Sequence, residues 1–104
     1  MRQRKMRIPA AGTAVRLSGR QGALVDISLS GALIEMNGPL DIGTEALMEL
    51  RKGAGALELM VRVVRLAKPR PRAQMVTGTA WPMGVTFVGN SAANLKAIPR
   101  FLGW

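Results

Sequence analysis

Residues 22–36 of the chain read GALVDISLSGALIEM. On both sides of Gly31 apolar residues alternate with polar or small ones, and a period of two is typical of strands with one buried face. Glycine tolerates the backbone conformations of tight turns, so Gly31 is expected to interrupt the run. The stretch therefore predicts one strand over residues 22–28 and a second over residues 32–36.

The alternation continues through the middle of the 104-residue chain. Further strands are predicted over residues 13–17, 44–50, 57–66, 75–80 and 83–88, the last two as one strand interrupted or bent near Trp81-Pro82. Arg62 and Arg65 lie three residues apart rather than two, and this slip predicts a β-bulge near Val63-Val64. Five or six short antiparallel strands within about 75 residues predict an all-β fold, a small barrel.

Residues that share the apolar phase of these strands are expected to form the core. They are Val25, Ile27, Ile34, Leu59, Val61, Val85 and Phe87. Because the chain has only two Phe and two Trp, aliphatic residues and Met must supply most of this core.

The chain divides into two parts by composition. Residues 1–9 form a basic arm that ends at Pro9, and residues 10–104 are expected to form the barrel with a short C-terminal helix. Within the second part, residues 68–72 (KPRPR) are predicted to be a loop, because neither proline can donate a hydrogen bond to a strand ladder.

The C-terminal helix is predicted to begin after residue 90. Asn90 or Ser91 can cap its N-terminus, and Pro99 predicts a helix that is short or kinked. Its apolar residues fall on one face, which is expected to plug the barrel: Ala92, Leu95 and Ile98.

Charge and composition narrow the classes of function. Lys and Arg number 15 against 6 Asp and Glu, and the net charge of +9 favours an anionic partner, although solubility alone would also account for it. The chain has no Cys and no His, so thiolates, the commonest metal ligand and the usual general base are absent and no metal site is expected. No apolar run approaches the roughly 18 residues of a membrane span, and no signal-peptide core follows the basic N-terminus. We therefore expect a cytoplasmic location, either as a whole protein or as a domain of a larger one.

Asp26 and Ser28 form the constellation most suggestive of a ligand site. They lie two apart on a predicted strand, so both are expected to point outward while Ile27 faces the core. A carboxylate beside a hydroxyl can accept hydrogen bonds from the N1–H and exocyclic amine of guanine. Gly31 would then permit a turn with positive φ or the close approach of a ligand. The alternative is that Asp26 and Ser28 only make local turn hydrogen bonds.

The basic arm could supply complementary contacts to a guanine nucleotide. Arg2, Arg4, Lys5 and Arg7 precede the first strand. The planar fork of an arginine suits both the O6/N7 edge of guanine and phosphate oxygens. The alternative is a solvated chain terminus.

These features together resemble the PilZ domain family. Asp26, Ser28 and Gly31 match the three fixed positions of its D/N-x-S-x-x-G motif. Residues 84–87 (GVTF) resemble the Gly-x-x-Phe stretch of its last strand, and residues 63–65 (VVR) resemble the apolar-Arg ending of its penultimate strand. The resemblance covers nearly the whole chain.

The resemblance implies a six-stranded antiparallel barrel with a C-terminal helix, and a non-catalytic receptor module of the bacterial cytoplasm. In that family an N-terminal R-x-x-x-R motif wraps cyclic di-GMP, as one molecule or a stacked pair, against the D/N-x-S-x-x-G surface. Arg7 fits the second arginine, whereas Gln3 stands at the first, flanked by Arg2 and Arg4. The ligand-binding residues implied are Arg2, Gln3, Arg4, Arg7, Asp26, Ser28 and Gly31. The implied partner is a protein effector or a fused domain, with membrane contact only indirect and no cofactor.

Two other functions remain open. Gln3 favours a degenerate PilZ module that acts through protein contacts without binding a nucleotide. The charge of +9 favours a small nucleic-acid-binding barrel, but stacking of bases needs exposed aromatic residues, and four aromatic residues provide few. An enzyme is the weakest reading, since no carboxylate is patterned with a base or nucleophile.

Overall fold

The computed structural model describes residues 8–9, 12–73, 75 and 77–103. Within these residues it has eight strands and one helix. The strands are β1 (Ile8–Pro9), β2 (Ala14–Leu17), β3 (Arg20–Ile27), β4 (Gly31–Met36), β5 (Glu45–Lys52), β6 (Gly55–Leu66), β7 (Arg70–Pro71) and β8 (Thr79–Phe87), and the helix is α1 (Ala92–Leu102).

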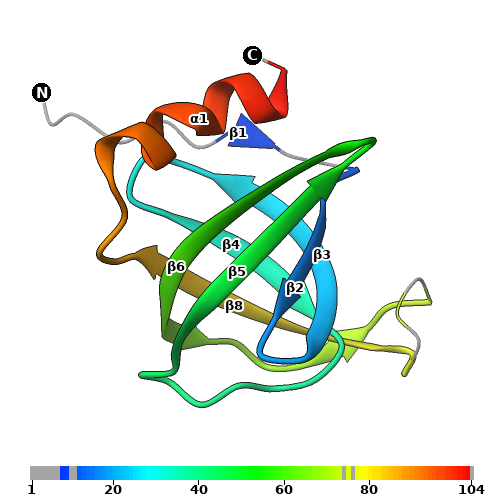
Figure 1. Ribbon diagram of the computed structural model, residues 1–104. Coiled ribbons are helices and arrows are strands. Elements are labelled where there is room, and N and C mark those ends of the chain that lie inside the picture. Colours follow the sequence, from blue (N-terminus) through cyan, green and yellow to red (C-terminus); the bar gives the residue numbers. More distant parts are fainter. Residues whose placement is uncertain (1–7, 10–11, 74, 76, 104) are drawn as a thin grey trace, which may run out of the picture.

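Six of the strands close into an antiparallel barrel (Figure 1). β3, β2, β5, β6, β8 and β4 are hydrogen-bonded in this order, and β4 pairs back with β3 to complete the ring. Closure leaves none of these six strands with a wholly unpaired edge. The six-stranded antiparallel barrel expected from the sequence is thereby confirmed. β1 and β7 are two-residue strands that pair with β3 and β8.

β8 is one continuous strand, not two segments bent at Trp81-Pro82. The carbonyl of Pro82 accepts a hydrogen bond of 2.9 Å from the N–H of Ala67, one residue beyond the end of β6. The missing N–H of Pro82 therefore falls where the ladder with β6 has already ended, which is the kind of position that proline tolerates. Met75 and Gly78, expected in a strand, lie instead in the turn between β7 and β8.

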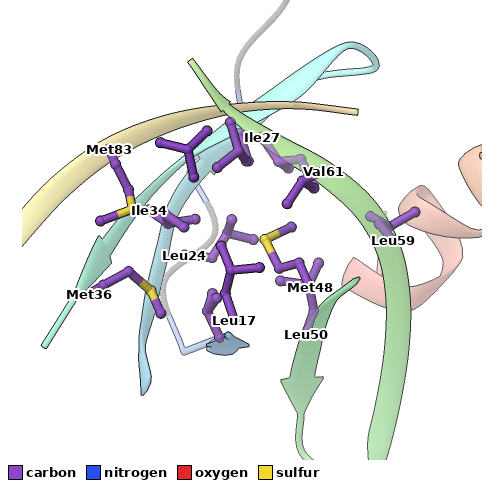
Figure 2. Packing of buried hydrophobic residues seen from close by; sticks show 14 of the residues in the cluster. Leu17, Leu24, Ile27, Ile34, Met36, Met48, Leu50, Leu59, Val61 and Met83 are labelled. Atoms are coloured by element: carbon purple, nitrogen blue, oxygen red, sulfur yellow. The ribbon is translucent and has the colours of Figure 1, made fainter. Parts of the chain in front are cut away.

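Aliphatic side chains and methionines fill the barrel (Figure 2). Five of the expected core residues are buried, namely Ile27, Ile34, Leu59, Val61 and Val85. Two expectations are wrong, because Val25 and Phe87 are only partly buried. Phe87 is the last residue of β8 and packs against the core from the end of the strand. Val25 is displaced by a bulge.

This bulge lies in β3 and reverses the predicted phase of the strand. Leu24 pairs with Ile34, and Asp26 pairs with Leu33, so Val25 is an extra residue with no partner on β4. As a result Leu24 and Ile27, three residues apart, are both buried in the core. Asp26 lies on the outer face because Val25 is bulged out of the ladder, since regular pairing of Val25 would have turned Asp26 inward with Leu24.

A second bulge lies in β6, where the spacing of the arginines predicts it. Val63 pairs with Val85, and Arg65 pairs with Gly84, so Val64 is the extra residue. Val63 is buried, and Arg65 is exposed on the outer face. The expected bulge near Val63-Val64 is confirmed.

α1 lies across one end of the barrel (Figure 1). Ser91 is its N-cap, and the Ser91 hydroxyl accepts a hydrogen bond of 3.1 Å from the N–H of Asn94. Ile98 and Leu102 are buried in the core, so the apolar face of the helix plugs the barrel as predicted, although Ala92 is exposed. The helix continues through Pro99, because burial of Ile98 and Leu102 offsets the hydrogen bond that proline cannot make. No helix in the described part of the chain is both long and apolar enough to cross a membrane.

Candidate ligand-binding surface

A three-residue loop, residues 28–30, joins β3 to β4. Ser28 is 5% exposed and holds this loop from inside. Its N–H donates to the carbonyl of Gly31 at 2.9 Å, and its hydroxyl accepts from the N–H of Ser30 at 3.3 Å. The expectation that Ser28 points outward beside Asp26 is wrong, because β3 ends at Ile27 and the chain turns there. Ser28 makes the local turn hydrogen bonds of the alternative interpretation.

Gly31 is required by the close approach of two strands. A Cβ at this position would lie 2.2 Å from the carbonyl oxygen of Val85 and 3.2 Å from the Cα of Thr86, both in β8. Gly31 does not have the positive φ that a tight turn was expected to need. The space left by its missing side chain is taken by β8, not by a ligand.

Ser30 fastens the loop to the end of β8. Its carbonyl accepts hydrogen bonds from the N–H of Phe87 at 2.9 Å and from the hydroxyl of Thr86 at 3.1 Å. Leu29, between these anchored serines, is 67% exposed. The loop therefore presents one apolar side chain to solvent on a fixed backbone.

β1 brings the root of the basic arm to this loop. Pro9 pairs with Asp26 and Ile8 pairs with Ile27, on the edge of β3 that β2 leaves unpaired. The first described residue of the chain therefore lies at the end of β3 from which the loop departs. Arg2, Gln3, Arg4 and Arg7, the arm residues expected to bind a ligand, lie outside the described residues.

A cross-strand row on the outer face of the barrel starts at Asp26. Asp26 on β3 pairs with Leu33 on β4, Leu33 pairs with Gly84 on β8, and Gly84 pairs with Arg65 on β6. The side chain of Arg65 lies over Gly84, with Nε 3.5 Å and Nη2 3.6 Å from the place that a Cβ on Gly84 would take. Sequence reasoning did not place Arg65 in one row with Asp26, although the arginine spacing that predicts the β6 bulge was a signal for its outward direction.

The fold agrees with the family comparison. The sequence profile of the PilZ domain matches residues 2–104. The chain belongs to the PilZ domain family. A solved structure with a similar fold is the PilZ domain with c-di-GMP of YcgR from Escherichia coli, which has a TM-score of 0.75 and 19% sequence identity over 99% of this chain and 90% of that chain. Among curated proteins, no sequence matches the chain.

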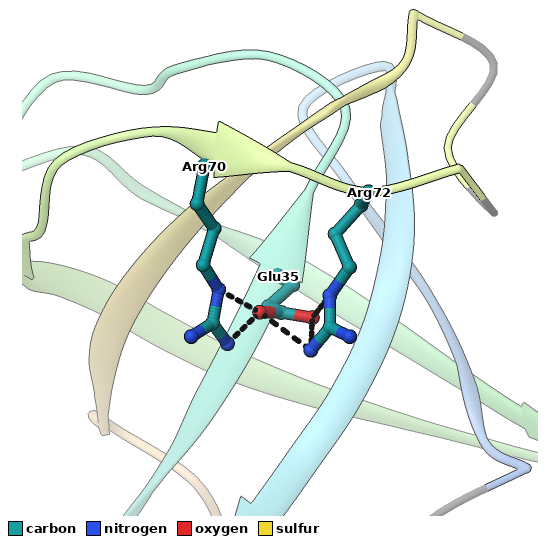
Figure 3. Close-up of polar contacts among 3 residues, drawn as sticks. All are labelled: Glu35, Arg70 and Arg72. Carbon is teal, nitrogen blue, oxygen red and sulfur yellow. Dashed lines mark hydrogen bonds and ion pairs between the residues drawn. The ribbon is translucent and has the colours of Figure 1, made fainter.

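This PilZ domain also carries an ion cluster two residues along β4 from Leu33, on the same outer face (Figure 3). The Glu35 carboxylate is 6% exposed and accepts hydrogen bonds from Nε of Arg70 at 2.9 Å and Nε of Arg72 at 3.0 Å. Both arginines come from the β7 segment and remain about half exposed. Glu35 thereby fastens the β7 hairpin of the PilZ domain to its barrel.

The charge state of this cluster follows from its contacts. Burial raises the pKa of the Glu35 carboxyl, but hydrogen bonds from Arg72 and Arg70, together with their positive charges, outweigh it. The pKa of Glu35 is therefore lowered from its ordinary value, and the group is ionised near neutral pH. In the described part of this PilZ domain, no three Asp, Glu, Cys or His side chains are grouped so that they could hold a metal ion.

Proposed function

We propose that this PilZ domain is a non-catalytic receptor for cyclic di-GMP in the bacterial cytoplasm. The observation that carries the proposal is the pairing of Ile8 and Pro9 with Ile27 and Asp26. This register brings the root of the arm, residues 1–9, to the same end of β3 as the motif loop. An anionic nucleotide bound at this junction would contact the arm on one side and the barrel, residues 10–104, on the other.

Asp26 is the proposed acceptor for the guanine base. The bulge at Val25 turns its side chain to the outer face, and a carboxylate there can accept both the N1–H and the exocyclic amine of one guanine. A paired contact of this kind discriminates guanine from adenine, because adenine has no N1–H to donate.

The arm is the proposed phosphate and guanine-edge clamp. Of the arm arginines, Arg7 is nearest in sequence to β1, because it directly precedes Ile8. With Gln3 at the other motif position, we propose that Arg4 or Arg2 shifts by one residue to supply the second guanidinium. The ligand binds as one molecule or as a stacked pair.

Ser28 and Gly31 have a different role in this proposal. Ser28 is buried and bonded within the loop, and Gly31 is covered by β8. We propose that both act by fixing the shape of the loop, while the ligand meets Asp26 and the exposed Leu29. The bound state is then relayed to a partner protein or to a fused domain.

Isothermal titration with cyclic di-GMP tests the proposal, with cyclic di-AMP and GMP as controls. Saturable binding of cyclic di-GMP, with a stoichiometry of one or two and much weaker binding of cyclic di-AMP, is the expected result. Absence of binding, or equal binding of the two cyclic dinucleotides, would overturn it. Gln3 favours the second candidate, a PilZ module that acts through protein contacts alone, and absence of binding would leave that candidate standing.

A further inference from the structure

Two separate bulges bring opposite charges onto one row of the outer face. If Val25 were paired in regular alternation, Asp26 would share the inward phase of Leu24, and if Val64 were so paired, Arg65 would share the inward phase of Val63. A bulge leaves one residue of the strand unpaired and turns the side chain that follows it to the opposite face. Each of these two bulges therefore delivers one end of the same row.

Between Asp26 and Arg65 the row consists of two apolar residues, Leu33 and Gly84. Leu33 is partly buried, and Gly84 is buried and has no side chain. Three strand spacings of about 4.8 Å separate the backbones of Asp26 and Arg65, a span of roughly 14 Å. Arg65 lies across Gly84 and so extends back over part of this span toward Leu33.

The exposed guanidinium of Arg65 lies against the backbone of β8 at Gly84. Its Nε and Nη2 lie at nearly equal distances, 3.5 and 3.6 Å, from the point above Gly84. Within the described residues Arg65 forms no ion pair, whereas Arg51, Arg62, Arg70 and Arg72 each have a carboxylate partner. An exposed guanidinium that no described carboxylate neutralises is suited to recognising a planar, electron-rich group.

We infer that Arg65 is a guanine-stacking residue of the ligand site, working across Leu33 from Asp26. The inference rests on the proposed cyclic di-GMP function and names a residue outside the motif loop and the arm. Nucleic-acid bases stack on arginine guanidinium planes as well as on aromatic rings. Gly84 leaves the room in which the guanidinium lies against the strand, and Leu33 supplies apolar surface beside it. The barrel thus stacks a base without an exposed aromatic residue at this place.

Titration of four proteins with cyclic di-GMP at two salt concentrations tests the inference: the parent, Arg65→Ala, Arg65→Lys and Arg51→Ala. Arg51 is the matched control, since it lies on β5, opposite β4 in the ring, and its removal also lowers the net charge by one. Arg65→Ala should weaken binding about 5- to 150-fold at both salt concentrations, the range for loss of one stacked base. Arg65→Lys should lose most of the same affinity, because lysine keeps the charge but not the plane. Arg51→Ala should change affinity little, and only at low salt.

An NMR measurement distinguishes stacking of a base on Arg65 from a general electrostatic attraction. In the parent protein the Nε–H proton resonance of Arg65 should move upfield on saturation with cyclic di-GMP, because a stacked base shields it. Melting temperatures of the variants report whether each folds. If the parent binds but Arg65→Ala behaves like Arg51→Ala, or Arg65→Lys binds like the parent, the inference is overturned and the proposed function stands. If the parent does not bind, both fall.

Discussion

Nζ of Lys52 donates a hydrogen bond of 2.7 Å to the carbonyl oxygen of Leu102, across 50 residues of sequence. Lys52 is the last residue of β5, and Leu102 is the last residue of α1. The positive charge therefore meets the negative end of the helix dipole and one of the carbonyls that the helix leaves unpaired. This contact ties the hairpin of β5 and β6 to the helix that plugs the barrel.

The helix should contribute to stability mainly through its buried side chains. Ile98 is 0% exposed, and Ile98→Ala should lower the free energy of unfolding by about 2–4 kcal/mol through lost burial and the cavity left behind. Lys52→Ala should cost under about 1 kcal/mol, since a partly exposed contact with a helix end is screened. Urea denaturation of both variants measures the difference. Equal losses would show that the helix is held by its polar contact instead.

Gly31→Ala should destabilise the barrel at the point where β4 meets β8. The new Cβ would overlap the carbonyl oxygen of Val85, and backbone must move to relieve the clash, at a cost of about 2 kcal/mol or more. Gly84→Ala is the matched control for stability, because a Cβ there makes only ordinary contacts of 3.5–3.6 Å with Arg65. Thermal and urea unfolding of the two variants test this. A Gly31→Ala protein as stable as Gly84→Ala would contradict the close packing.

Glu35→Gln should loosen the β7 hairpin. The substitution removes a charge that two arginines share, and because those arginines are about half exposed the loss should be only about 1–2 kcal/mol. Amide hydrogen exchange of the β7 segment should quicken more than exchange of the barrel strands. Glu45→Gln, which breaks the exposed pair with Arg62, should cost less than about 1 kcal/mol and leave β7 unchanged.

The same cluster gives a pH dependence with a definite sign. Because the pKa of Glu35 is lower in the folded protein than its ordinary value of 4.5, its stabilisation is fully present above that value. It is lost as the pH falls through the lower, folded pKa. The difference in unfolding free energy between the parent and Glu35→Gln should therefore be constant from pH 7 to about 5 and shrink in more acidic solution. A difference that grows in acid would contradict the lowered pKa.

Asp26→Ala should weaken cyclic di-GMP binding by about 1–3 kcal/mol, the value of a paired contact with a base edge. Folding should survive, because the side chain lies on the outer face and Val25, which forms the bulge, is retained. Calorimetry with a melting curve for each protein checks both points. A variant that binds as tightly as the parent would show that Asp26 has no role in recognition.

The arginines of the arm should not be equivalent. Arg7→Ala should abolish most binding, since it removes a fork that can span a guanine edge and a phosphate oxygen. Of Arg4→Ala and Arg2→Ala, we expect Arg4→Ala to cost more, because Arg4 is nearer the anchored β1 and loses less chain entropy on ordering. Gln3→Arg should tighten binding or raise the ligand count.

Titration of the arm variants at two salt concentrations distinguishes specific contacts from a diffuse field. A residue that contributes only long-range attraction should cost on the order of 1 kcal/mol or less, and its effect should fade with salt. Equal, small and salt-sensitive losses for the three arginine variants would contradict the proposed clamp.

The sequence by itself determined the all-β barrel and the position of most of its strands along the chain. Alternation with a period of two is a local property, because successive side chains of a strand point to opposite faces whatever lies beside them. The bulge at Val64 was readable for the same reason, since Arg62 and Arg65 mark the outer face by their charge. The six-residue motif likewise indicated the family, which the profile match over residues 2–104 then showed.

Only the tertiary structure decided which face Asp26 occupies and why. Ala23, Leu24 and Val25 are all apolar, so the sequence there contains no polar marker of the phase, and the burial of Leu24 follows from its pairing with Ile34. The direction expected for Asp26 was right although the phase behind it was wrong. For Ser28 the expected direction failed, because the strand ends one residue earlier.

The need for glycine at position 31 and the burial of Glu35 also depend on residues far away in the sequence. Gly31 is needed because the carbonyl of Val85 approaches it, and Glu35 is buried because arginines 35 and 37 residues later cover it. Arg65 joins the row of Asp26 through pairings that pass across β4 and β8. A sequence pattern records what each strand buries, whereas contacts between strands depend on register, and register is fixed only when the ring of six strands closes.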